Sequence, residues 1–230
     1  MVAAMSGAVR IASLPKGWRL LGWTSVALIA MVVGLRAVYG LDEAGIRVLI
    51  RATARTSFAF FLLAFVASPL RRVWRSPASA WLLANRRYLG LSFAVSHLLH
   101  LIAIFALYHW SGRELLAGTS PVVAVVGGLG YLLLAALAAT SFDGAVALLG
   151  VRRWRLLHTV GMYYLWFVFA VSYVPRAIGA PTYLPGALLA AGALAMRIAC
   201  RPGRARRPAS VPAGRRRDVA VPGAPPPRSA

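Results

Sequence analysis

Three histidines stand inside apolar stretches of this 230-residue chain, where their side chains could bind a metal ion. His97 and His100 lie near the middle of the run from Arg86 to His109, and residues three apart share one face of a helix. His158 lies in a later apolar run. Neutral imidazoles from two facing helices can ligate a metal or a haem iron. Ionisable groups inside a membrane segment are costly, so these positions indicate function.

The runs that must position these histidines predict an all-α membrane protein. The chain is 60% hydrophobic, and its apolar runs lack the period-two alternation of strands. About 20 apolar residues are enough for a helix to cross a bilayer, inside which the backbone must satisfy its own hydrogen bonds. We therefore expect a six-helix transmembrane bundle. Its helices are expected over residues 18–39 and about 50–70, 86–109, 121–139, 154–174 and 186–198.

Arginines at the ends of the apolar runs predict the orientation of the bundle. The formal charge is +21, and 25 of the 26 basic residues are arginine. The connections after the second and fourth expected helices hold five and three arginines, whereas the others are nearly balanced or carry one. The positive-inside rule then places both termini in the cytoplasm. The transmembrane domain covers 18–200, between a basic arm over 1–17 and an Arg- and Pro-rich tail over 201–230 that we expect to be disordered and cytoplasmic.

Composition and motifs exclude several kinds of function. A strongly basic chain could bind nucleic acid, but no RNA- or DNA-binding motif accompanies the arginines, so no nucleic-acid partner is expected. The single cysteine, Cys200, excludes an intrachain disulfide and a cysteine-ligated iron–sulfur cluster. No glycine-rich nucleotide fingerprint is present. If the chain carries electrons, it does so without a substrate or nucleotide domain of its own.

Short motifs around the histidines resemble those of the ferric reductase-like transmembrane domain family. These motifs are Ser68-Pro69-Leu70-Arg71, Arg86-Arg87-Tyr88-Leu89-Gly90-Leu91 followed by His100, Thr140-Ser141, Leu149-Gly150 and Arg153-Trp154-Arg155-Leu156-Leu157-His158. The likeness extends from about Gly45 to Met196. Within the family, the chain is most similar to the haem-binding membrane subunits of bacterial periplasmic methionine sulfoxide reductase systems.

The resemblance implies a multi-pass b-type haem protein of the bacterial plasma (inner) membrane. Its partners would be the lipid bilayer, a cytoplasmic flavin reductase-like donor and a periplasmic redox acceptor such as a methionine sulfoxide reductase catalytic subunit. Haem b is the implied cofactor, and FMN is also compatible with the resemblance. The family usually has another histidine about 13 residues after the one that matches His158, where this chain has Val171. One haem per chain is therefore the more economical expectation.

Two histidines of the third expected helix remain candidates for the same ligand position. The resemblance places His100 in the family motif, whereas helix depth favours His97. At about 1.5 Å per residue, His158 lies about 9 Å from Arg152, while His97 and His100 lie about 15 Å and about 20 Å from Arg87. We expect the iron to bind His158 and one of these two.

Arg55, in the outer half of the second expected helix, is a candidate for neutralising a haem propionate with its forked guanidinium. Its alternative role is to reach the outer interface. For the whole chain, the alternative is a non-redox membrane packing or transport protein whose histidines form hydrogen bonds between helices. The lack of Asp and Glu inside the expected spans argues against a cation pathway.

Overall fold

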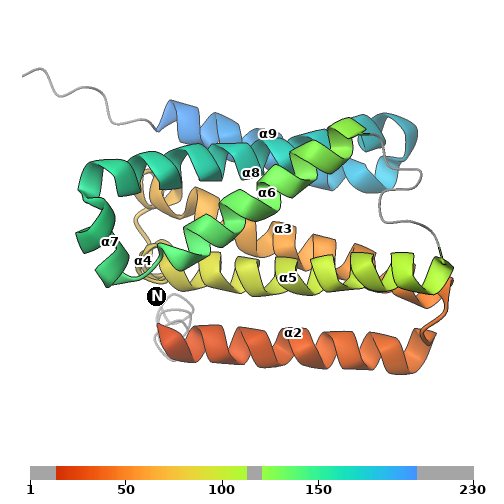
Figure 1. Ribbon diagram of the computed structural model, residues 1–230. Helices are drawn as coiled ribbons and strands as arrows, with labels where there is room; N and C mark the ends of the chain where they lie inside the picture. Colours follow the sequence, from red (N-terminus) through yellow and green to blue (C-terminus); the bar gives the residue numbers. More distant parts are fainter. Residues whose placement is uncertain (1–13, 113–120, 201–230) are drawn as a thin grey trace, which may run out of the picture.

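The computed structural model describes residues 14–112 and 121–200, and every regular element in these ranges is helical. Six helices are long and apolar enough to cross a membrane, as predicted (Figure 1). They are α2 (Trp18–Tyr39), α3 (Glu43–Val73), α5 (Arg86–Ser111), α6 (Pro121–Ala139), α8 (Val151–Gly179) and α9 (Leu184–Ala199), the last preceded by the short turn η1 (Pro181–Tyr183). Most of the predicted arm and the whole predicted tail lie outside the described residues.

Two short helices occupy connections that the sequence left without structure. They are α4 (Pro77–Ala84) and α7 (Asp143–Leu149). In α4, the hydroxyl groups of Ser76 and Ser79 each accept a hydrogen bond from the other residue's backbone amide, which caps the first turn. Gly150 separates α7 from α8 with φ of +74°, a conformation that residues other than glycine rarely adopt.

Two spanning helices are longer than predicted. The start of α3 is Glu43 rather than a residue near 50, because the Asp42 side chain accepts a hydrogen bond from the Gly45 amide (2.9 Å) and caps the helix there. The end of α8 is Gly179, so this helix continues through Pro175, where the sequence predicted a loop. The predicted ends of these two helices are therefore wrong by one to two turns, because charged residues and proline near the membrane boundary predict a loop.

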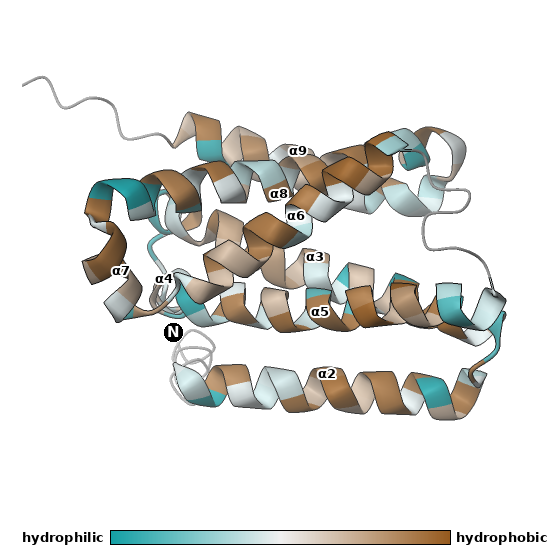
Figure 2. Ribbon diagram, in the orientation of Figure 1, coloured by the Kyte–Doolittle hydropathy of each residue, from teal (hydrophilic) through white to brown (hydrophobic). Residues whose placement is uncertain are grey.

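Aromatic side chains of α3, α5 and α8 form the core of the bundle. Phe61 and Phe65 of α3 are fully buried, and Phe93 of α5 and Phe169 of α8 pack against Phe61 with ring centroids 5.5 and 5.1 Å away. Apolar residues make up most of α2 and α6 (Figure 2), and many large hydrophobic side chains of the bundle are exposed. This surface suits lipid, since the bilayer replaces water around it.

Near Pro69 of α3, hydrogen bonds connect three helices at one end of the bundle. Pro69 has no amide hydrogen, so the carbonyl group of Phe65, four residues earlier, lacks its helical donor. Arg197 of α9 donates to this carbonyl oxygen at 2.7 Å, and Arg86 of α5 donates to the neighbouring Ala64 oxygen at 3.1 Å. We call this end, where α3 and α6 end and α5 and α8 begin, the cavity end.

Candidate functional site

His158 borders a cavity at the cavity end of the bundle. The cavity has a volume of about 490 Å³, and its lining comes from α3, α5, α6, α7, α8 and α9 and the turn before α7. Sites for small molecules and cofactors usually measure about 300 to 1,000 Å³. Phe93, Leu134 and Leu165 form part of the apolar wall, and His158 is the only histidine in the lining. The cavity therefore combines cofactor-sized space with one imidazole.

Four arginines give the cavity a positive wall. They are Arg86, Arg87, Arg155 and Arg197, and Asp143 is the one carboxylate in the lining. A guanidinium group of Arg87 contacts this carboxylate at 3.0 Å, whereas its buried Nε atom has no hydrogen-bond partner in the described part of the chain. Guanidinium groups bind carboxylates through two parallel hydrogen bonds. The wall thus suits an anionic group, a feature that the sequence prediction missed because it depends on contacts between distant helices.

Thr140 and Trp154 fix the ring of His158. The Nε2 atom lies 3.1 Å from the Thr140 hydroxyl oxygen, and the imidazole packs on the Trp154 indole at 4.3 Å between centroids. Since the Thr140 hydroxyl group donates to the Ala136 carbonyl oxygen (2.6 Å), it accepts a hydrogen bond from Nε2–H, and Nδ1 carries the lone pair. The Trp154 indole donates in turn to the Thr140 carbonyl oxygen at 2.8 Å. His158 is therefore held at the edge of the cavity with a nitrogen able to bind iron.

His100 lies in the interface of α3 and α5. Its Nδ1 atom is 3.1 Å from both the Ile50 carbonyl oxygen and the Thr53 hydroxyl oxygen. A carbonyl oxygen can only accept, so Nδ1 carries the proton and Nε2 keeps its lone pair. Metal-binding histidines are commonly held by such a bond. Of the two α5 candidates, His100 is thus the one with the hydrogen-bonding pattern of a ligand.

His97 faces α6 and α8 instead. Its ring stacks on Tyr131 at 4.6 Å and lies 6.1 Å from the ring of Phe169. The Nδ1 atom of His97 and the hydroxyl oxygen of Tyr131 are buried and without hydrogen-bond partners among the described residues. A buried polar atom without a hydrogen bond lowers the stability of a protein by about 1–3 kcal/mol. His97 therefore lacks the supporting bond that His100 has.

The cavity histidine and the α5 histidines lie at different levels of the bundle. Phe169, which contacts His97, lies 11 residues after His158 on α8, and Tyr131 lies 9 residues before Thr140 on α6. These separations correspond to about 14 to 17 Å along the helices. Metal–imidazole bonds are about 2 Å long, so the structure does not bring His158 and the α5 histidines to one iron. No cluster of three or more His, Cys, Asp or Glu side chains exists in the described residues.

Arg55 lies away from the cavity. Its side chain is exposed on α3, within electrostatic range of the Tyr173 hydroxyl group near the far end of α8. Val171, where the family resemblance predicts a histidine, is 44% exposed on the outside of α8. Neither residue borders the positive wall.

Comparison with curated proteins finds relatives that share one name. The chain is 35% identical over 116 residues to the protein-methionine-sulfoxide reductase heme-binding subunit MsrQ of Polaromonas naphthalenivorans, covering 48% of this chain and 50% of that protein. It is 31% identical over 163 residues to MsrQ of Azospira oryzae (63% of this chain, 67% of that protein). It is 33% identical over 141 residues to MsrQ of Cronobacter sakazakii (56% and 68%).

The match thus spans half of the first relative and about two thirds of the other two. No protein-family profile matches the chain, and no solved structure matches it. The relatives confirm the resemblance to haem-binding membrane subunits that the sequence motifs predicted.

Proposed function

Because the chain belongs to the MsrQ family of protein-methionine-sulfoxide reductase heme-binding subunits, we propose that it is the haem-binding, electron-carrying membrane subunit of such a system. It takes electrons from a cytoplasmic flavin reductase-like donor and passes them to a periplasmic methionine sulfoxide reductase catalytic subunit. The names of the relatives and the six apolar helices support this role in the bacterial inner membrane. FMN is a further candidate cofactor.

The observation that carries the proposal is the arginine-lined cavity beside His158. Haem b, when bound there, supplies one-electron redox chemistry at an iron whose potential depends on axial ligation and burial. His158, which borders the cavity, would be the residue that binds the iron. The four arginines would neutralise its propionates by charge-assisted hydrogen bonds, and the apolar wall with Phe93 would exclude water.

The distribution of charge supports an orientation with the cavity facing the cytoplasm. In the described part of the chain, the cavity end holds eleven basic residues against the single carboxylate of Asp143. The opposite end, where α5 and α8 end and α3 begins, holds five basic and two acidic residues. The positive-inside rule then assigns the cavity end to the cytoplasm, where a flavin-dependent donor can reach it.

One haem per chain is the stoichiometry we propose. The cavity offers a single histidine, and at the level of His100 the described residues offer no histidine from a facing helix. His100 is the second candidate ligand, because its Nδ1–H is already bonded and its Nε2 is available. His97, with its unsatisfied Nδ1, is the third.

Spectra of the purified protein test the proposal. We expect a Soret band and, after dithionite reduction, the sharp α band of a b-type haem, with one haem per chain in a pyridine haemochrome assay. The exposed His109, at the end of α5, gives a matched control, since His109→Ala should leave the spectrum unchanged. A protein without haem bands after expression with excess haem precursor would favour the non-redox alternative, in which the histidines only join helices.

A further inference from the structure

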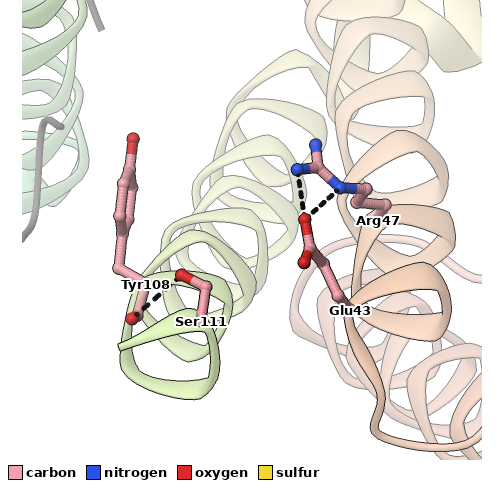
Figure 3. Close-up of polar contacts among 4 residues, drawn as sticks. All are labelled: Glu43, Arg47, Tyr108 and Ser111. Carbon is pink, nitrogen blue, oxygen red and sulfur yellow. Dashed lines mark hydrogen bonds and ion pairs between the residues drawn. The ribbon is translucent and has the colours of Figure 1, made fainter. Parts of the chain in front are cut away.

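Arginines lie at the end of the bundle opposite the cavity, where the positive-inside rule does not call for them. They are Arg36, Arg47, Arg51, Arg55 and Arg176. Two acidic residues described at this end are engaged locally: Glu43 binds Arg47 (2.5 Å between Oε1 and Nη2; Figure 3), and Asp42 caps α3. This end therefore keeps an excess of positive charge.

Arg55 and Arg176 gather around one tyrosine. Arg55 lies one turn from Phe58 on α3, and Arg176 lies one turn from Tyr173 on α8, while the rings of Phe58 and Tyr173 are 4.6 Å apart. Both guanidinium groups are within electrostatic range of the Tyr173 hydroxyl group, and both side chains are exposed. Neither is paired with a carboxylate in residues 14–112 and 121–200.

A column of aromatic rings joins this place to the cavity. Phe93 lines the cavity, and its ring centroid lies 5.9 Å from that of Phe169. Phe169 lies 5.1 Å from Phe58, and Tyr173, in contact with Phe58, lies 6.2 Å from Tyr183 of the η1 turn. These spacings are those of packed aromatic pairs. Phe93, Phe169 and Phe58 are buried, whereas the two tyrosines are half-buried. The column thus runs from the cavity wall to the surface.

We propose that Arg55, Arg176, Tyr173 and Tyr183 form a docking surface for an acidic, electron-accepting protein. This inference rests on the proposed function and names the surface that its acceptor uses. Positive charge steers an acidic partner toward the end of the aromatic column, and arginine and tyrosine are residue types that interfaces favour. In the docked complex one electron would pass to the partner, so that this protein is oxidised by one electron and the partner is reduced by one electron, and no bond forms or breaks.

Binding to proteins of opposite charge tests the docking surface directly. An acidic blue-copper protein and a basic cytochrome c serve as probes, each titrated against the full chain in nanodiscs of neutral lipid at low ionic strength. We expect the acidic probe to bind and the basic probe not to bind. The double variant Arg55→Gln/Arg176→Gln should slow association of the acidic probe by at least about tenfold, because steering by charge contributes 10- to 1,000-fold to association rates. High salt should abolish the difference.

A matched variant separates this surface from the general charge of the same end. Arg36 is exposed near the end of α2, which packs against α3 and α5, and Arg36→Gln should leave association unchanged. Oxidation of the dithionite-reduced protein by the acidic probe gives a second readout, which should slow in the double variant and in Tyr173→Leu but not in Arg36→Gln.

Equal association of the acidic probe with wild type and the double variant would overturn the docking surface. The same holds if the double variant loses affinity only for vesicles that contain anionic lipid, since the two arginines would then bind headgroups. A wild-type protein without haem would refute the proposed function instead, while the binding titration would still decide whether the surface exists.

Discussion

His158 and His100 are the same residue type in very different surroundings. His158 borders about 490 Å³ of space with four arginines on its wall, whereas His100 is packed between α3 and α5 with its Nδ1 bonded to Ile50 and Thr53. The first region has room and countercharge for an anionic cofactor. The second has an imidazole already held by hydrogen bonds, but it does not border this cavity. The contrast shows that residue type and spacing in the sequence identify candidate haem ligands, whereas the space and the charge around each histidine select among them.

Loss of the cavity ligand should have the largest effect. We expect His158→Ala to lower the haem-to-protein ratio by at least about tenfold, because even loss of an outer hydrogen bond to a metal ligand costs 10- to 100-fold. His100→Ala should leave the haem of the cavity in place, since about 14 to 17 Å along the helices separates the two levels. Haem quantification of both variants, with His109→Ala beside them, measures this.

Loss of all haem in His100→Ala, with haem kept in His158→Ala, would contradict a haem in the cavity beside His158. A wild-type ratio of two haems per chain would show that the α5 level holds a haem of its own, so the two regions would then be two sites rather than a site and a packed interface.

Filling the cavity should have the second largest effect. Gly90 lines the cavity, and a Cβ atom added there meets no other atom within 4 Å. We expect Gly90→Leu to fold, since leucine favours helix over glycine by about 1 kcal/mol, but to bind haem weakly because its side chain occupies the space. Gly127→Leu on α6, also without neighbours within 4 Å and outside the cavity lining, is the control. Equal haem content in both variants would contradict a haem in this cavity.

Substitutions of two cavity arginines should distinguish an effect on haem binding from an effect on the stability of the apoprotein. Arg155→Gln alters an exposed side chain, so we expect weaker haem binding and an unchanged melting temperature of the apoprotein. Arg197→Gln also removes the donor to the Phe65 carbonyl oxygen, so the free energy of unfolding should fall by about 1–3 kcal/mol. Thermal melts with and without haem distinguish the two. Identical melting temperatures of the two apoproteins would show that the hydrogen bond from Arg197 to the Phe65 carbonyl oxygen does not stabilise α3 near Pro69.

Much of the fold could be predicted because membrane helices carry a strong local signal. The ends of α2 and α6 agree with the prediction, since a long apolar run predicts each of these helices. The prediction missed the extra turns of α3 and α8, because a cap at Asp42 and tolerance of Pro175 depend on geometry rather than on hydropathy.

The candidate site could be predicted only in part. The sequence selected His158 as a ligand, and the structure places this residue at the border of the cavity. It could not place the arginine wall, because Arg86 and Arg197 are 111 positions apart and meet only when α5 and α9 pack on α3, where they donate to the carbonyl oxygens of Ala64 and Phe65. Arg55 was selected for a propionate, but which end of a helix faces a cavity depends on packing that composition does not encode.

The smallest effect is expected from Thr53→Val, which tests whether the region of His100 is only a packed interface. The Thr53 hydroxyl group is buried and donates to the Leu49 carbonyl oxygen at 2.8 Å while contacting His100. Valine keeps the shape and leaves Ile50 as an acceptor for Nδ1–H, so the free energy of unfolding should fall by only about 1 kcal/mol. The haem content and midpoint potential should not change, because the cavity lies at another level. Thr53→Ser, which keeps the hydroxyl group, is the control. A shift in midpoint potential in Thr53→Val but not in Thr53→Ser would mean that His100 binds the iron, since a bond to the far nitrogen of a ligand tunes its metal.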